Sequence, residues 1–507
     1  RRFHNLLLDW REQGILDWDA YSFLKTEQPR IPCFYMLPKV HKDLNNPPGR
    51  PIVSSNGSLL EAASIYFDFF LSPFVSGLRS YCRDSTSFLR DLSGLHWESD
   101  YVMITFDVVS LYTCIAHFLG LQACQYFLRT RSIELYDHNV MLCDMLEFCL
   151  NENIFFFNNE YFRQLNGTAM GSSFAPSYAG LFVGWWEETV AWAEELEDYF
   201  GHVMYWTRYI DDLFIVWSGS QSKALEYIAL LNQNQYNLKF THTLSKECID
   251  FLDVRIQIKK NTICTSLFRK QTAGNSILHY GSHHTVVLKN GIPYGGLIRI
   301  KRSSSHSDTF EQAKNDSLVR FTARGYPRKI LRVAESRVAL RSRPSLLNKT
   351  NKTTGPNVVR LITTFHSQSY AVRKILEKHW TILKNDKVLN NLLPPKPSVT
   401  YRRAPSIGDK LTHSCLTPVV ETSSRQGFVK CGHCKACVHA SPTKQYTLPS
   451  GRIKYITKFM TCISDFGVYV ITCPCSLHYV GSAIFLVKKR IFEHIRAIKK
   501  SDYTYTV

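Results

Sequence analysis

The sequence predicts an α+β protein of several domains. Short apolar runs of strand type, such as Tyr101 to Phe106 and Leu213 to Trp217, alternate along the chain with longer helical patterns, such as Ser177 to Val190. The 507 residues, of which 45% are hydrophobic, are enough for roughly three to four domains. The sequence contains no internal repeat and no coiled-coil heptad pattern.

The composition is strongly basic. The chain carries 61 Lys and Arg residues against 42 Asp and Glu residues, giving a formal net charge of +19 and a pI near 9.2. This charge predicts a polyanionic partner, most often nucleic acid, although a ribosome- or membrane-associated protein would share it. An apolar run of about 18 residues and a signal peptide are both missing, so neither membrane spanning nor secretion is indicated. The 15 Cys are then expected to be reduced, and the start at Arg1 suggests a fragment of a longer protein.

Near the N-terminus, a Pro-rich basic segment runs from Ile31 to Lys42 and is followed by a strand-type run, Gly49 to Ser54. Basic side chains beside extended strands are suited to clamp a phosphate, and we expect Lys39, Lys42 and Arg50 to do so. Arg50 is the best candidate because a guanidinium binds phosphate in a bidentate manner. The alternative is a solvated basic loop.

Three carboxylates stand at the ends of predicted strands. Asp107 follows the run Tyr101 to Phe106, and Asp211 and Asp212 occupy a turn between two apolar runs. Neighbouring acids repel one another unless a cation or a basic partner offsets their charge, although an Asp-rich turn is the simpler alternative. If the first strand lies beside the hairpin, the three acids could hold two cations about 3.5 to 4 Å apart for phosphoryl transfer.

The segment from Gly167 to Pro176 is rich in small residues and precedes the helical stretch Ser177 to Val190. Small residues let a substrate approach the backbone closely. The alternative is an ordinary loop that caps a core helix.

In order, the basic segment, the strand that ends in Asp107, the small-residue loop and Tyr209-Ile210-Asp211-Asp212 resemble a reverse transcriptase. The resemblance implies a right-hand polymerase with fingers, palm and thumb, in which Asp107, Asp211 and Asp212 are catalytic and bind two Mg²⁺ ions. The substrate-binding residues that it implies are Lys39, Lys42, Arg50, Val108, Tyr112 and Gly171.

Tyr112 matches the bulky residue that leaves no room for a 2′-hydroxyl and so selects deoxynucleotides, although it could also be a core aromatic. Gly171 resembles a loop position beneath the template and nucleotide, where a side chain would collide with the pair. Leu238 to Thr241 and Phe251 to Val254 resemble the next two palm motifs, the second being a primer grip.

Several segments make the resemblance more specific. The chain is similar to Penelope-like retroelements in the segments Asp107 to Tyr112, Gly167 to Ser172, His279 to His284, Asn290 to Arg299 and Arg324 to Pro327. The last two lie in the thumb of such proteins. The resemblance covers residues 30 to 340 approximately.

The C-terminal part resembles a GIY-YIG endonuclease, which Penelope-like elements often carry. The matching segments are Gly467-Val468-Tyr469, Tyr479-Val480-Gly481 and Arg490 to His494. The resemblance implies catalytic roles for Tyr469, Tyr479, Arg490 and His494. Ser482 replaces a frequent Lys and the chain ends before a later metal-binding Glu, so we expect a partial domain. An inactive β-hairpin with a basic helix is the alternative.

A Cys-rich segment precedes the nuclease-like part. Cys431, Cys434, Cys437 and His439 are soft ligands at close spacing, which favours Zn²⁺ in a reducing compartment. Four ligands within nine residues would strain a single tetrahedral site, so further ligands are expected from elsewhere. The available residues are Cys462, Cys473, Cys475 and His478. Unligated reduced thiols are the alternative.

The expected domains are the N-terminal and fingers region (1–100), the palm (101–260), the thumb (261–343), a connector (344–430) and a Cys-rich segment with a partial GIY-YIG domain (431–507). Residues 299–343 hold twelve Lys or Arg against four acids, which suits a helical domain facing a duplex backbone.

The resemblance implies a nuclear RNA-directed DNA polymerase that extends a DNA 3′-end on the RNA of its own element. Its partners would be template RNA, target and primer DNA and deoxynucleoside triphosphates, with a dimer left open and no membrane. Two alternatives remain: an inactive nucleic-acid-binding remnant, and a telomerase-like enzyme of chromosome ends. Intact Asp107, Asp211 and Asp212 argue against the first, and the nuclease-like tail against the second.

Overall fold

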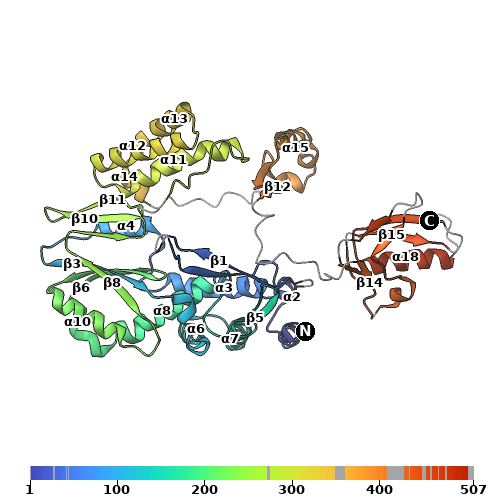
Figure 1. Cartoon of the computed structure of the whole chain (residues 1–507), viewed down its shortest axis with the longest axis horizontal. Coiled ribbons are helices and arrows are strands. Elements are labelled where there is room, and N and C mark those ends of the chain that lie inside the picture. The colour runs from blue at the N-terminus through green and yellow to red at the C-terminus, as the bar shows by residue number, and fades with distance from the viewer. Residues whose placement is uncertain are drawn as a thin grey trace. The chain divides into compact units, whose positions relative to one another are not determined.

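The computed structural model describes residues 2–26, 29–40, 43, 45–270, 274–348, 360–407, 427–432, 434–447, 453–456, 459–465, 467–473 and 477–500. The chain forms two compact units, residues 1–414 and residues 415–507 (Figure 1). Helices and strands are mixed in both units, which confirms the predicted α+β class.

The first unit contains a central antiparallel sheet in the order β6-β7-β3-β8. Its strands are β3 (Tyr101–Val108), β6 (Val203–Tyr209), β7 (Asp212–Ser218) and β8 (Phe240–Ser245). Residues from Leu213 to Trp217 are all buried, because β7 lies inside the sheet and both of its faces are covered.

Alternate residues of β3 and β7 enter two different cores, as the two-residue period of a strand requires. Ile104, Ile215 and Trp217 belong to the larger core, which includes side chains of α6 (His117–Arg131), α8 (Ala175–Trp186) and α10 (Gln221–Asn232). Met103 and Phe214 belong to the second core. That core includes side chains of α4 (Ser85–Ser93) and of the three-stranded sheet β11-β10-β9.

The other helices of this part are α1 (Arg2–Glu12), α2 (Trp18–Leu24), α3 (Glu61–Ser76), α5 (Leu111–Cys114), α7 (Tyr136–Asn151), a π-helical turn (Glu187–Ala191), a 3-10 turn (Glu194–Leu196) and α9 (Glu197–Phe200). The second core's sheet consists of β9 (Cys248–Phe251), β10 (Val254–Lys259) and β11 (Thr262–Leu267).

A second four-stranded sheet has the order β2-β1-β4-β5. It consists of β1 (Cys33–Pro38), β2 (Gly49–Ser54), β4 (Ile154–Phe157) and β5 (Glu160–Arg163). β1 and β2 pair antiparallel with Arg50 opposite Leu37, so the basic segment expected in the fingers forms a hairpin.

Helices α11 (Val286–Ser303), α12 (Ser307–Ala323) and α13 (Arg328–Ala339) form a bundle beside β11 (Figure 1). Leu297 and Ile300 of α11 pack with Ala334 and Val338 of α13. After α14 (Arg343–Leu347), the Arg90 guanidinium donates to the Leu347 carbonyl at 2.9 and 3.1 Å, which ties the end of the bundle to α4.

The expected connector has secondary structure of its own. Strands β12 (Arg360–Thr364) and β13 (Ser398–Arg402) pair in parallel, with α15 (Ser369–Lys384) and α16 (Leu389–Leu392) between them. The Trp380 indole N–H donates to the Pro394 carbonyl at 2.9 Å and so fixes the return to β13.

The second unit is built from short strands and one long helix. Its elements are β14 (Gly427–Val429), a 3-10 helix (Lys435–His439), β15 (Gln445–Thr447), β16 (Ile453–Tyr455), β17 (Phe459–Thr461), β18 (Gly467–Thr472), β19 (His478–Ala483) and α18 (Val487–Lys500). β14 pairs with β17, β15 with β16, and β18 with β19. Across both units, the described part of the chain contains no helix with the length and apolarity needed to span a membrane.

Candidate active site

The structure brings the three predicted carboxylates to one end of the central sheet. Asp107 of β3 lies directly opposite Asp212 of β7 in the antiparallel register. Asp211 occupies the two-residue turn between Tyr209 and Asp212, and its carbonyl accepts a hydrogen bond from the Val108 N–H at 3.2 Å. The condition set by the sequence, that the first strand lies beside the hairpin, is therefore met.

The neighbouring carboxylates disfavour the charged forms of Asp211 and Asp212. Burial, together with the charges of Asp211 and Asp107, raises the pKa of Asp212 to about 6, against the opposing charge of Lys270. Burial and Asp107 also raise the pKa of Asp211, while Arg50 and Lys39 act in the opposite direction. Such a cluster of oxygen ligands with excess negative charge is suited to hard divalent cations such as Mg²⁺.

A cavity of about 290 Å³ adjoins this cluster. It is lined by Asp107 and Asp212, by residues of β8, and by the β9–β10 turn that includes Leu252. Lys270 also lines the cavity and provides a positive charge near Asp212 that was not predicted from the sequence. No motif surrounds this lysine, so only the packing of the strands could have revealed it.

Tyr112, Arg50 and Lys39 lie within the electrostatic reach of Asp211. Burial and the Asp211 charge raise the pKa of Tyr112 to about 12, against the charge of Arg50. Arg50 is exposed on β2, and the Lys39 N–H donates to the Pro48 carbonyl at 2.8 Å. Tyr112, Arg50 and Lys39, three of the predicted substrate-binding residues, therefore lie near the Ile210–Asp211 turn. Lys42 lies outside the described residues.

The small-residue loop joins these parts. Gly171 has φ +141°, and a Cβ there would lie 2.2 Å from the Val53 carbonyl oxygen of β2. The Ser55 hydroxyl donates to the Gly171 carbonyl at 2.8 Å. A glycine is therefore required at position 171 because the loop contacts the backbone of β2 there. The sequence had suggested a different reason, a clash of a side chain with the bound template and nucleotide.

Gly167, at the start of the same loop, meets α5, the short helix that carries Tyr112. Its φ is +72°, and a Cβ there would lie 2.5 Å from the Tyr112 carbonyl oxygen. The Thr168 N–H donates to that carbonyl at 2.7 Å. The loop thus contacts both β2, which carries Arg50, and α5, which carries Tyr112.

Val108 does not present its side chain to a substrate. The side chain is 3% exposed and belongs to the larger core. Residues alternate across β3, so Val108 turns into the core while the neighbouring Asp107 is exposed. The predicted substrate contact of Val108 is therefore limited to its backbone.

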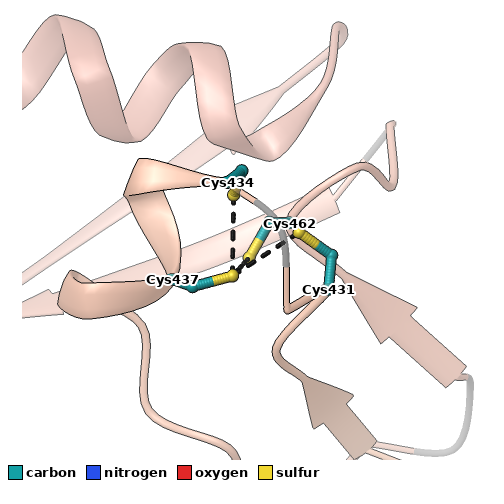
Figure 2. A group of neighbouring side chains, drawn as sticks. All are labelled: Cys431, Cys434, Cys437 and Cys462. Carbon is teal, nitrogen blue, oxygen red and sulfur yellow. Dashed lines mark hydrogen bonds between the residues drawn. The ribbon is translucent and has the colours of Figure 1, made fainter.

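In the second unit, four cysteines converge. The Sγ atoms of Cys431, Cys434, Cys437 and Cys462 lie within 4.8 Å of one another (Figure 2). Cys437 Sγ is 3.5 Å from those of Cys431 and Cys462 and 3.6 Å from that of Cys434. A tetrahedral ZnS₄ site with Zn–S bonds of about 2.3 Å has sulfur–sulfur edges of about 3.8 Å, so the cluster fits zinc.

The electrostatics of the cluster favour the thiolate form at Cys437 and disfavour it at Cys462. Against the effect of burial, hydrogen bonds from Cys431 and from backbone groups lower the pKa of Cys437 to about 6. Burial raises the pKa of Cys462 to about 12. A zinc ion would supply the charge needed to deprotonate the remaining thiols.

The ligand set differs from the predicted one at one position. His439 is exposed and lies outside the cluster, and Cys462, which follows β17, takes the fourth place. Cys434 and Cys437 are three residues apart along the 3-10 turn and so share one side, whereas His439 does not. Of the other available residues, Cys473 is exposed outside the cluster and Cys475 lies outside the described residues.

The residues that resemble nuclease motifs also meet. The Tyr469 hydroxyl lies 2.8 Å from His494 Nε2 and accepts a hydrogen bond from Arg490 Nε at 3.3 Å. The Tyr479 ring lies 5.3 Å from the His494 ring. A Cβ on Gly481 would lie 2.4 Å from the Tyr469 hydroxyl, so this glycine leaves the space that Tyr469 occupies.

The charges in this cluster are suited to proton transfer. Burial and the neighbouring Arg490 lower the pKa of His494, which keeps its imidazole neutral near pH 7 and able to accept a proton. Burial raises the pKa of Tyr469, while Arg490 favours its ionised form. The arrangement can therefore share a proton between the tyrosine and the histidine beside a fixed positive charge.

Comparisons with known proteins give one family match and several distant structural likenesses. The animal helix-turn-helix domain family matches residues 276–332, which include α11, α12 and the start of α13. No curated protein matches the chain in sequence.

The structural likenesses include two telomerases and a viral polymerase. Telomerase from Candida albicans, in complex with a fragment of telomeric RNA, is 11% identical with a TM-score of 0.42, covering 72% of this chain and 59% of that one. Apo telomerase from Candida tropicalis is 10% identical with a TM-score of 0.39, covering 64% of each chain. The BmCPV RNA-dependent RNA polymerase is 10% identical with a TM-score of 0.38, covering 57% of this chain and 26% of that one. The chain spans less than two thirds of each of these structures, and likenesses this distant decide neither fold nor activity.

The raised pKa of Asp212 predicts a pH-dependent effect on stability in metal-free protein. Because the folded-state pKa of about 6 exceeds the ordinary 3.8, the stability that this proton contributes at low pH is lost as the pH rises through 6. As the pH rises from about 4.5 to 7.5, the parent should lose unfolding free energy on the order of 2 kcal/mol through the deprotonation of Asp212. Asp212→Asn has no such proton to lose, so its stability should rise relative to the parent by this amount over the same range. Urea unfolding in EDTA measures this, with the exposed Asp198→Asn as control. Parallel pH curves for Asp212→Asn and the parent would contradict the raised pKa.

The four-cysteine cluster predicts about one zinc ion per chain. Cys462→Ser should lose the zinc because it removes one of four ligands, whereas Cys473→Ser and His439→Ala should retain it. Zinc is measured by mass spectrometry of metals in purified protein. Stoichiometric zinc in Cys462→Ser would show that this ligand set is wrong.

Proposed function

We propose that the first unit is an RNA-directed DNA polymerase that extends a DNA 3′-end on an RNA template. The observation that carries the proposal is the register of β3 and β7, which sets Asp107 opposite Asp212 and beside Asp211. Three neighbouring carboxylates at one end of a sheet could supply the ligands of a two-metal phosphoryl-transfer site, which supports the proposal.

Asp107, Asp211 and Asp212 would hold two Mg²⁺ ions, which supply activation of the primer 3′-hydroxyl and stabilisation of the triphosphate charge. Arg50 and Lys39 would bind the triphosphate, because both charges act on Asp211 and neither side chain is buried. The β1–β2 pairing and the close contact of Gly171 with β2 support the strand that carries Arg50.

Tyr112 would select deoxynucleotides. It lies in α5, the short helix after β3, half-buried, and the Asp211 and Arg50 charges both act on its hydroxyl. A ring held at this place would lie under the sugar of a nucleotide bound between Arg50 and the metals and would exclude a 2′-hydroxyl.

The helical bundle would bind the nucleic-acid backbone. Helix α13 buries Leu331, Ala334 and Val338, and its basic residues lie on the exposed side. These exposed residues are Arg328, Lys329, Arg332 and Arg337. A row of cations on one side of a helix neutralises phosphates without reading bases.

The finer assignment rests on the sequence resemblance. We propose a Penelope-like retroelement enzyme that acts in the nucleus on the RNA of its own element, on target and primer DNA and on deoxynucleoside triphosphates. The segments that support it, Asn290 to Arg299 and Arg324 to Pro327, form the packed parts of α11 and of the α12–α13 turn.

Primer extension on RNA and DNA templates with Mg²⁺ tests the polymerase proposal. The double substitution Asp211→Ala/Asp212→Ala should lower extension by at least about 100-fold, because it removes two of three metal ligands. The matched control is Glu194→Ala/Glu195→Ala, which removes an adjacent pair of exposed acids elsewhere and should extend like the parent. Extension by the Asp211→Ala/Asp212→Ala variant at the parent's rate would refute the catalytic assignment. A parent protein that extends no primer would favour the alternative of an inactive nucleic-acid-binding remnant.

We also propose that the second unit nicks DNA. The observation that favours this is the hydrogen-bonded cluster of Tyr469, His494 and Arg490 with the Tyr479 ring beside it. His494 would take a proton from Tyr469 or from a water bound beside it, and Arg490 would stabilise phosphate charge.

Nicking of supercoiled plasmid in the presence of a divalent cation tests the second proposal. Tyr469→Phe should lower the nicking rate by about 100-fold, since it removes the proton-transferring hydroxyl but keeps the ring. Tyr455→Phe, on an exposed tyrosine of the same unit, should nick like the parent. Equal rates for Tyr469→Phe and the parent would remove Tyr469 from the mechanism.

A further inference from the structure

A buried ion pair lies beneath the carboxylate turn. Arg208 on β6 and Glu187 at the start of the π-helical turn are each 4% exposed. Arg208 Nε lies 3.0 Å from Glu187 Oε1, and Arg208 Nη2 lies 3.0 Å from Glu187 Oε2. The pair is therefore bidentate and almost completely removed from water.

The same guanidinium also holds the turn itself. Arg208 Nη1 donates to the Ile210 carbonyl at 3.0 Å, and Nη2 donates to the Gly180 carbonyl of α8 at 3.1 Å. Ile210 has φ +56°, a left-handed conformation that is costly for a β-branched residue. Since Ile210 directly precedes Asp211, the charged hydrogen bond stabilises the backbone conformation from which both acids of the turn project.

The rest of the network keeps Arg208 and Glu187 in place. Glu187 also accepts hydrogen bonds from the Ser80 hydroxyl at 2.6 Å and the Trp206 indole N–H at 3.0 Å. The Arg208 N–H donates to the Ser80 carbonyl at 2.6 Å, and the Cys82 N–H donates to the Arg208 carbonyl at 2.9 Å. Both the side chain and the backbone of Arg208 are thus fixed from several elements.

Stability alone does not account for this arrangement. Removing two charges from water costs about as much as their attraction returns, so an apolar pair of similar volume would often serve the fold equally well. What an apolar pair cannot do is donate to the Ile210 carbonyl while anchored to α8. The network is therefore specific to the geometry of the turn.

We propose that Arg208 and Glu187 are positioning residues that hold the Ile210–Asp211 turn in its metal-binding conformation. The proposal rests on the polymerase function proposed above, and it adds residues that touch neither metal nor substrate. Arg208 acts through the Ile210 carbonyl, and Glu187 acts by orienting Arg208.

The discriminating substitution is Arg208→Lys. An ammonium keeps the charge and one bond to Glu187 but lacks the planar fork that reaches Glu187, Gly180 and Ile210 together. In primer extension we expect kcat to fall by about tenfold. The Mg²⁺ concentration that gives the half-maximal rate should rise by about the same factor. A tenfold change corresponds to the free energy contributed by about one hydrogen bond from a charged group. The KM for deoxynucleotides should change by less than about twofold, because Arg50 and Tyr112 are untouched.

Two variants control for charge chemistry and for stability. Arg131→Lys changes a half-exposed arginine paired with Glu188, the residue next to Glu187, and should leave the Mg²⁺ dependence unchanged. Leu231→Ala truncates a buried side chain of α10, an element outside the turn, and lowers stability by leaving a cavity. Arg208→Lys matching Leu231→Ala in both kcat and Mg²⁺ dependence would overturn the positioning role.

A readout without turnover separates this inference from the polymerase proposal. Mn²⁺ binding, followed by electron paramagnetic resonance, should weaken in Arg208→Lys about as it does in Asp211→Ala, whether or not the parent extends primers. If Arg208→Lys fails to fold, Arg208→Met/Glu187→Leu supplies an apolar pair. That double variant should fold but should bind Mn²⁺ more weakly than the parent. If it bound Mn²⁺ as tightly as the parent, the inference would be refuted.

Discussion

The antiparallel pairing of β3 with β7 is the constraint on which the first unit depends. Its register sets Asp107 opposite Asp212, and the same register sends alternate residues of both strands into two separate cores. A slip of one residue would exchange the two faces, moving Ile104 and Met103 into the wrong cores and separating the acids. Core packing and site geometry are therefore enforced by the same pairing, and the carboxylates can remain close despite their repulsion.

Neighbouring elements are built around this pairing. Gly167 and Gly171 allow one loop to contact both the backbone at Tyr112 and the backbone of β2, which links three parts of the candidate site without a side chain between them. The buried Arg208–Glu187 pair holds the turn from below, through α8 and the π-helical turn. The second unit uses a different means, since a cluster of cysteines joins its 3-10 turn to the end of β17 where apolar burial is small.

Much of this site could be predicted from the sequence, because its chemistry is local. Adjacent acids between apolar runs, an acid at the end of a strand and glycines before a helix are visible in a few residues each. Tyr469, Tyr479, Arg490 and His494 were predicted in a different way, from a resemblance to a known endonuclease family. Lys270 and Cys462 carry no local motif of this kind. Cys462 could only be named as one of several available ligands, and His439 was expected in its place, because the direction of a side chain in a 3-10 turn is not apparent from spacing alone.

The sequence by itself determined which residue types stand at strand ends and turns, and hence the α+β class and the candidate chemistry. Only the tertiary structure decided which of them face one another. It placed Val108 in the core while Asp107 remained exposed, and it revealed a clash with Val53 behind Gly171. It also brought Glu187, Gly180 and Ile210 around one guanidinium. The physical reason is that hydrogen bonds, steric contact and Coulomb interactions depend on distances in space, and strands far apart in the chain acquire these distances only when they pair and pack.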